Sequence, residues 1–133
     1  IANGINNASV FGNFGLAQRQ GEIVLGGGGF SGAGTGNAQS STIALTGTTT
    51  DGSATSLFVN GDSNTTAIAR TSGIFLSFEA VVMGVRTGGK FGTTGGWGAA
   101  MQFSGSDMVL QVSGAASMNI SWSATLDLYE LKV

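Results

Sequence analysis

Three glycines that follow an apolar run are the first residues whose spacing could bind a ligand. In "GEIVLGGGGFSGAGTGNAQ", residues 21 to 39, Gly27, Gly29 and Gly32 form the pattern G-x-G-x-x-G. A dinucleotide-binding loop of this pattern needs a helix that begins at the last glycine, because the helix N-terminus faces the pyrophosphate. The residues that follow, "SGAGTGNAQSST", cannot form a helix. We therefore interpret the glycines as backbone that packs closely against a neighbouring segment.

The chain contains no histidine and no cysteine, which removes most of the usual catalytic and metal chemistry. Ser-His-Asp sites, Cys-His sites, imidazole bases and the common zinc sites are excluded. Two carboxylates could still hydrolyse a glycosidic bond, and the chain has seven acids from which to form a pair. Glu79 and Asp127 are the candidates for this alternative, a polysaccharide depolymerase. Nothing in the sequence pairs them, so we predict no catalytic residues and no cofactor.

Aromatic residues and a glycine-rich loop are the candidates for ligand binding. Trp97, Tyr129 and Trp122 could form a platform for a sugar, because an aromatic face suits the apolar face of a pyranose. Trp122 lies on an apolar strand face and is expected in the core. Lys90 lies in the loop of residues 86–96, among five glycines, and long loops often carry binding contacts. We predict ligand contacts at Trp97, Lys90 and Tyr129.

One carboxylate lies within an apolar strand pattern. An unpaired charge buried there would be costly, so we expect Glu79 to form a buried ion pair. Its candidate partners are Arg70, Arg86 and Arg19, from the same chain or a neighbouring copy. The alternative is that Glu79 is a ligand-binding or catalytic acid.

A calcium loop is the other metal site worth testing. Asn60, Asp62 and Asn64 have the alternate spacing of such a loop, but the glutamate that should close it is missing. We therefore predict a hairpin turn at this position and no metal site.

Two long segments show which elements carry these residues. In "FLSFEAVVMGVRT", residues 75–87, both alternating faces are mainly apolar, which is typical of a central strand buried on two sides. In "SMNISWSATLDLYELKV", residues 117–133, one face is apolar from Met118 to Leu128 and the other is polar. That pattern predicts a strand with one face on a core and the other on water or another subunit.

Composition favours short strands joined by turns. The chain has 24 glycines and no proline, and further strand patterns recur at close spacing after residue 37. We predict an antiparallel β-sandwich, jelly-roll-like, of about seven or eight short strands over residues 37–133. Residues 1–36 lack sustained alternation, and we predict a separate glycine-rich stub of short strands and turns there, suited to fibre or partner contacts.

The charge of the chain argues against two classes of partner. The formal net charge is −2 and 9% of the residues are charged, so no basic field attracts nucleic acid or an anionic membrane surface. No apolar run is long enough to span a membrane. Low charge also indicates a surface covered by partner subunits. Because the chain begins at Ile1, we expect it to be a fragment or a processed product.

Several segments, in their order along residues 15–131, resemble a β-rich domain near the C-termini of bacteriophage tail fibres and other phage receptor-binding proteins. The most specific are "GNAQSSTIALTGTTTDGSATSLFV", "FEAVVMGVRT" and "VLQVSGAASMNISWSATLDL". The chain departs from that pattern between Arg86 and Trp97, where such domains usually carry further strands.

The resemblance implies a non-enzymatic, extracellular module of a virion appendage, assembled as a homotrimer or as another multimer. It would contact other virion subunits and could bind a bacterial surface polysaccharide. The same fold in a capsid decoration or head-fibre protein is the alternative that this resemblance leaves open. It supplies no catalytic residues.

Overall fold

The computed structural model of the chain describes residues 7–28, 34–59, 68–69, 74–87, 97–104 and 107–132. Every regular element in these ranges is a β-strand, which confirms the all-β prediction. The described ranges hold no helix that could cross a membrane. The strands are, in chain order, β1 (Ser9–Asn13), β2 (Ile23–Gly27), β3 (Ala38–Thr49), β4 (Ala54–Ser56), β5 (Phe58–Val59), β6 (Ile68–Ala69), β7 (Ile74–Arg86), β8 (Gly98–Ser104), β9 (Asp107–Ser113) and β10 (Ile120–Lys132).

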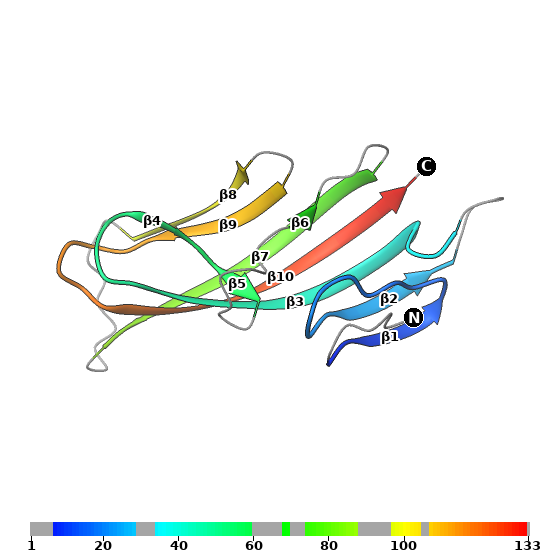
Figure 1. The fold of residues 1–133 in the computed structure, drawn as a ribbon, viewed down its shortest axis with the longest axis horizontal. Helices are drawn as coiled ribbons and strands as arrows, with labels where there is room; N and C mark the ends of the chain where they lie inside the picture. The colour runs from blue at the N-terminus through cyan, green and yellow to red at the C-terminus, as the bar shows by residue number, and fades with distance from the viewer. Residues whose placement is uncertain are drawn as a thin grey trace. The chain divides into compact units, whose positions relative to one another are not determined.

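The strands form two sheets, whose order can be followed in Figure 1. The first sheet has the order β1-β2-β3-β10-β7, and β5 also pairs with β3. The second has the order β4-β9-β6, and β8 also pairs with β9. The long strand β3 pairs with the last strand β10, and the next strand β4 pairs with β9. This nested pairing agrees with the predicted jelly-roll-like sandwich.

The chain divides into two compact units. Unit 1 consists of residues 1–44, 71–80 and 125–133, and unit 2 of residues 45–70 and 81–124. Strands β3, β7 and β10 contribute residues to both units. The boundary that the sequence suggested near Asn37 is therefore not a division of the structure. The reason is that β2 pairs with β3, with Ile23 opposite Thr42, so the N-terminal segment continues a sheet.

Unit 2 holds the sandwich core. The backbone N–H of Leu57, between β4 and β5, donates to the carbonyl of Leu110 in β9 over 2.8 Å. The indole Nε1 of Trp122 donates to Thr49 Oγ1 over 2.9 Å, which satisfies the buried donor. The buried apolar side chains of this unit are those of Leu45, Leu57, Val59, Met108, Val109, Leu110, Val112, Ile120, Trp122 and Ala124.

Unit 1 is built on β1 and β2, which pair in parallel, and on the first residues of β3. Its buried apolar side chains are those of Ala17, Val24, Ile43, Leu126 and Leu128. Polar side chains are buried in the same unit, and these are Glu22, Gln39, Ser41 and Glu130. A core this polar needs internal hydrogen bonds, because each unpaired buried polar group costs stability.

Strand β10 alternates as the sequence predicts. Its even-numbered residues from Ile120 to Glu130 are buried, and the residues between them are exposed or half-buried. Every other residue of a strand points to the same face, so the apolar pattern and the burial pattern coincide.

Strand β7 differs from the prediction. It is the last strand of the first sheet in the described structure, and therefore an edge strand, whereas its sequence is typical of a central one. Val81 and Met83 on its outer face are 69% and 59% exposed. Its inner face meets β10 at Gly84, where a Cβ atom would lie 2.7 Å from Cζ3 of Trp122. The prediction of a strand buried on both sides is thus wrong for the single chain.

The glycine motif is followed by a strand. Gly27 is the last residue of β2, and a Cβ atom there would lie 3.3 Å from the carbonyl oxygen of Ala38. Gly29 and Gly32 lie outside the described residues, and Ala38 already begins β3. The close approach at Gly27 agrees with the interpretation of tight backbone packing.

Candidate ligand site

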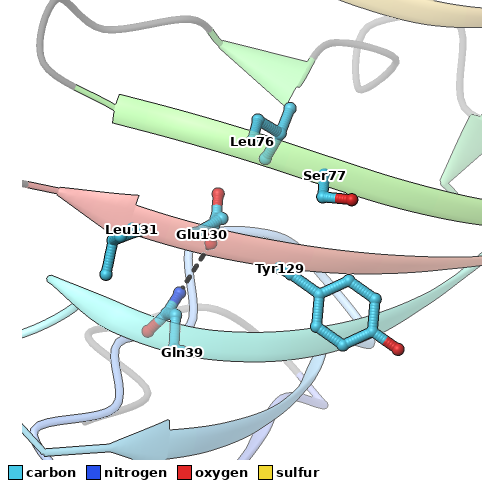
Figure 2. Close-up of a pocket in the computed structure, with 6 residues that line it drawn as sticks. All are labelled: Gln39, Leu76, Ser77, Tyr129, Glu130 and Leu131. Carbon is cyan, nitrogen blue, oxygen red and sulfur yellow. Dashed lines mark hydrogen bonds between the residues drawn. The ribbon is translucent and has the colours of Figure 1, made fainter.

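A pocket of about 430 Å³ in unit 1 is the strongest candidate for a ligand site. Two of its residues come from β7 and three from β10, and one comes from the start of β3. The lining residues are Leu76, Ser77, Tyr129, Glu130, Leu131 and Gln39, as Figure 2 shows. Such a volume is typical of small-molecule sites.

Three consecutive residues of β10 line this pocket, and the alternation of the strand directs their side chains to opposite faces of the sheet. Tyr129 and Leu131 point to the outer face of the sheet, and Tyr129 is 52% exposed. Glu130 points inward and is only 8% exposed. The exposed ring of Tyr129 and the buried carboxylate of Glu130 therefore lie on opposite faces of the sheet.

Glu130 is held by two hydrogen bonds. Gln39 Nε2 donates to its Oε2 over 2.8 Å, which Figure 2 marks with a dashed line. Arg19 Nη2 donates to its Oε1 over 3.2 Å. These two bonds hold the Glu130 carboxylate on the inward side of β10.

Arg19 also binds a second acid, Glu22, which is fully buried. The guanidinium Nη1 lies 2.8 Å from Glu22 Oε1. The other carboxylate oxygen, Oε2, accepts the backbone N–H groups of Gln18 and Arg19 at 2.7 and 2.9 Å. We call Arg19, Glu22, Gln39 and Glu130 the buried charge cluster. It contains two carboxylates and one guanidinium, which leaves one formal negative charge.

Gln39 joins this cluster to the N-terminal segment. Its Oε1 accepts the backbone N–H of Leu16 over 2.9 Å, and its Nε2 also donates to the Leu16 carbonyl over 3.1 Å. The amide is thereby fixed in position and orientation. The hydrogen bonds of the cluster therefore connect residues 16–22 to β3 and β10.

A second pocket, of about 480 Å³, lies in unit 2. It contains no charged side chain. Its lining residues are Thr46, Gly47, Thr48, Thr55, Ser56, Phe58, Ser121 and Trp122. Hydroxyl groups alone could hold a neutral ligand, but no buried polar group fixes its orientation.

The predicted ligand residues do not form one site. Tyr129 lines the unit 1 pocket. Trp97 is half-buried and packs edge-on against Trp122, with ring centroids 5.7 Å apart, so it is not an exposed platform. Its Nε1 is buried without a hydrogen-bond partner among the described residues. Lys90 lies outside the described residues, as do Asn60, Asp62 and Asn64.

The prediction of a buried carboxylate at Glu79 is wrong within the single chain. Both Glu79 and Arg86 are exposed, and the described salt bridges do not include either. Arg70 lies outside the described residues. A partner for Glu79 from a neighbouring copy stays a prediction.

The buried acids are instead Glu22 and Glu130. The inward face of β10, if continued past Leu128, would have identified Glu130 from the sequence. No local pattern indicates that Glu22 is buried, because one of its neighbours in the cluster is more than 100 residues away in sequence.

The alternative acid pair gains no support from the described pockets. Asp127 is half-buried and accepts a hydrogen bond from Thr42 Oγ1 over 2.6 Å. Neither Asp127 nor Glu79 lines a pocket described above. Within the described ranges, no group of three or more acidic, histidine or cysteine side chains could hold a metal ion.

Comparison with protein families, with curated proteins and with solved structures gives no match for this chain.

Proposed function

We propose that the chain is a non-enzymatic structural and adhesive module of a phage tail fibre or related virion appendage, and that it assembles as a homotrimer. The observation that carries the assembly part is the outer face of β7. Val81, Met83 and Val85 follow one another on that face and are exposed in the single chain. The appendage and the number of copies come from the resemblance of the ordered segments to tail-fibre domains.

The physical argument rests on how proteins treat edge strands. A long, apolar edge strand promotes association, and monomeric proteins usually interrupt it with lysine, proline or a bulge. Strand β7 is 13 residues long, contains neither lysine nor proline, and has Glu79 and Arg86 as its only charges. A strand that is apolar on both faces is typical of burial on both sides. A further copy of this chain, which carries few charges, supplies a suitable cover.

A second group of exposed apolar side chains supports the same proposal in unit 1. Phe11 on β1 lies opposite Leu25 on β2, and both side chains are exposed, as is Ile23. Exposed apolar patches of this kind commonly mark contacts between proteins.

The test places the same charge on strands of two different sheets. Met83→Glu puts a carboxylate on the outer face of β7, and Gln102→Glu puts one on the exposed strand β8 of the second sheet. In sedimentation velocity, Met83→Glu is expected to shift the protein from a multimer to single chains, whereas Gln102→Glu leaves the multimer intact. If neither variant dissociates the protein, the assembly surface is not the outer face of β7.

A further inference from the structure

The register of β3 against β10 shows which exposed side chains share a face of unit 1. Thr42 Oγ1 on β3 donates to Asp127 Oδ1 on β10 over 2.6 Å. Three residues earlier on β3, Gln39 donates to Glu130, which lies three residues later on β10. Opposite steps of this kind are those of an antiparallel pair. The residue of β10 opposite each position of this part of β3 follows from these two bonds.

A row of side chains crosses four strands on the outer face of unit 1. Two residues before Thr42 on β3, Ser40 lies opposite Tyr129 of β10. Ser40 also lies opposite Leu25 of β2, and Leu25 lies opposite Phe11 of β1. Side chains of directly opposite residues share a face of the sheet. The row therefore joins β1, β2, β3 and β10 on one face.

This face has a low middle and two apolar sides. Ser40 and Thr42 on the middle strand are small and half-buried. Strands two apart in a sheet lie about 9.6 Å from each other, so a row of side chains from another chain fits between the two sides. We call the exposed apolar side chains on both sides the unit 1 face. They are those of Phe11, Ile23, Leu25, Tyr129 and Leu131.

The outer face of β7 has the converse form. Val81, Met83 and Val85 make one exposed apolar row along the strand. On the neighbouring strand β10, the exposed residues of unit 2 include Ser121 and Ser123, which are small. The β7 row therefore stands higher than the side chains next to it. A raised row fills a low middle, whereas two raised rows or two low ones leave gaps, and stable interfaces pack closely.

We infer that the outer face of β7 in one copy packs against the unit 1 face of the next copy. The contact joins two different surfaces, and its repetition closes a ring of three copies. One kind of contact then covers both apolar surfaces of every copy. A symmetric contact of either surface with itself would leave the other in water. The inference rests on the multimer of the proposed function and names the surface that covers β7.

The exposed area is of the size that such a contact needs. The eight side chains of the two surfaces are between 36% and 69% exposed, and none of them is charged. Since a large side chain has a surface of roughly 150 to 250 Å², together they expose on the order of 700 Å². A specific interface buries at least about 1,200 Å², of which about 60% is apolar. The two surfaces together therefore supply the apolar part of one interface.

A mixture of two variants, each with one damaged surface, tests this pairing. Leu25→Glu damages the unit 1 face, and Met83→Glu damages the outer face of β7. In light scattering each variant alone is expected at 13.2 kDa, the mass of one chain. The equimolar mixture should contain a particle of twice that mass, because the intact surface of one variant fits that of the other and the ring cannot close. Gln102→Glu, on β8 outside both surfaces, is the control and should keep the full multimer.

A second variant guards against a failure of folding. Tyr129→Glu, on the other side of the unit 1 face, should dissociate the multimer as Leu25→Glu does. It should also form the same particle of two chains with Met83→Glu. Circular dichroism checks that each variant is folded.

Two results would overturn the pairing and leave the assembly proposal standing. One is a multimer that neither Leu25→Glu nor Tyr129→Glu dissociates, because another surface would then cover β7. The other is a mixture with no particle larger than those of the separate variants, because the two surfaces would then not meet. An unchanged chain of 13.2 kDa at every concentration would instead contradict the assembly proposal, and the pairing with it.

Discussion

Strands β7 and β10 are neighbours in one sheet and have the same length. The sequence pattern of β10 matches its burial in a single chain, whereas that of β7 does not. In β10 every inward residue from Ile120 to Glu130 is buried, and the residues on its other face are exposed or half-buried. In β7 both faces are mainly apolar, and Val81 and Met83 on the outer face remain exposed. The difference teaches that a two-sided apolar pattern does not by itself place a strand in the middle of a sheet, and the exposed outer face of β7 is the observation on which the proposed assembly rests.

The largest expected effect concerns the inner face of β10. Trp122→Ala removes a buried ring that packs against Trp97 and Gly84, and it leaves Thr49 Oγ1 without its donor. Such truncations cost about 4 kcal/mol of unfolding free energy. Ser123→Ala, on the exposed face, should change it by less than about 0.5 kcal/mol. Urea unfolding of both variants measures the contrast, and equal losses would contradict the assignment of the two faces.

The buried charge cluster at the end of β10 should give the next largest effect. Arg19→Met keeps the length of the side chain but leaves Glu22 and Glu130 without their cation. Removing one partner of a buried pair costs about 3 kcal/mol. The control is Lys132→Met, which removes an exposed cation at the end of β10. Urea unfolding measures both variants. If Arg19→Met loses no more unfolding free energy than Lys132→Met, the buried charge cluster does not stabilise the fold.

The contact between β7 and β10 should respond to a single methyl group. In Gly84→Ala the new Cβ would lie 2.7 Å from the Trp122 ring, and such overpacking costs about 2 kcal/mol. Gly52→Ala is the matched control, because the nearest atom to its Cβ is 3.8 Å away. Thermal unfolding should show a lower midpoint for the first variant only. Equal midpoints would mean that β7 can move away from β10 without cost.

The smallest effect is expected at an exposed turn that belongs to neither β7 nor β10. Ser53 donates its backbone N–H to Asp51 Oδ1 over 2.7 Å, and this bond, with one from the Ser53 side chain, holds the pKa of Asp51 below its ordinary value of 3.8. A lowered folded pKa adds stability at higher pH, which is lost as pH falls below 3.8 through the folded value. The free energy of unfolding of Asp51→Ala, measured at several pH values, should therefore be slightly lower than that of the unchanged chain at neutral pH. The difference between the two free energies should vanish in acid. A difference that persists in acid would contradict this account.

Alternation within a strand could be read from the sequence, because it depends only on residues two positions apart. It correctly gave the inward face of β10 and, if extended, would have given Glu130. The neighbours of a strand depend on pairings between distant segments, so the edge position of β7 was missed. The same reason explains the N-terminal segment, where Glu22 is buried by contacts that involve Arg19 and, through it, Glu130.

The mass of the native particle in solution tests the central claim most directly, which is that the apolar outer face of β7 is covered by further copies of the chain. Light scattering across the micromolar range should give three times the 13.2 kDa of one chain, and Met83→Glu should reduce it towards one chain. A particle of 13.2 kDa at every concentration would contradict the account, because the outer face of β7 would then be stable in water without a partner.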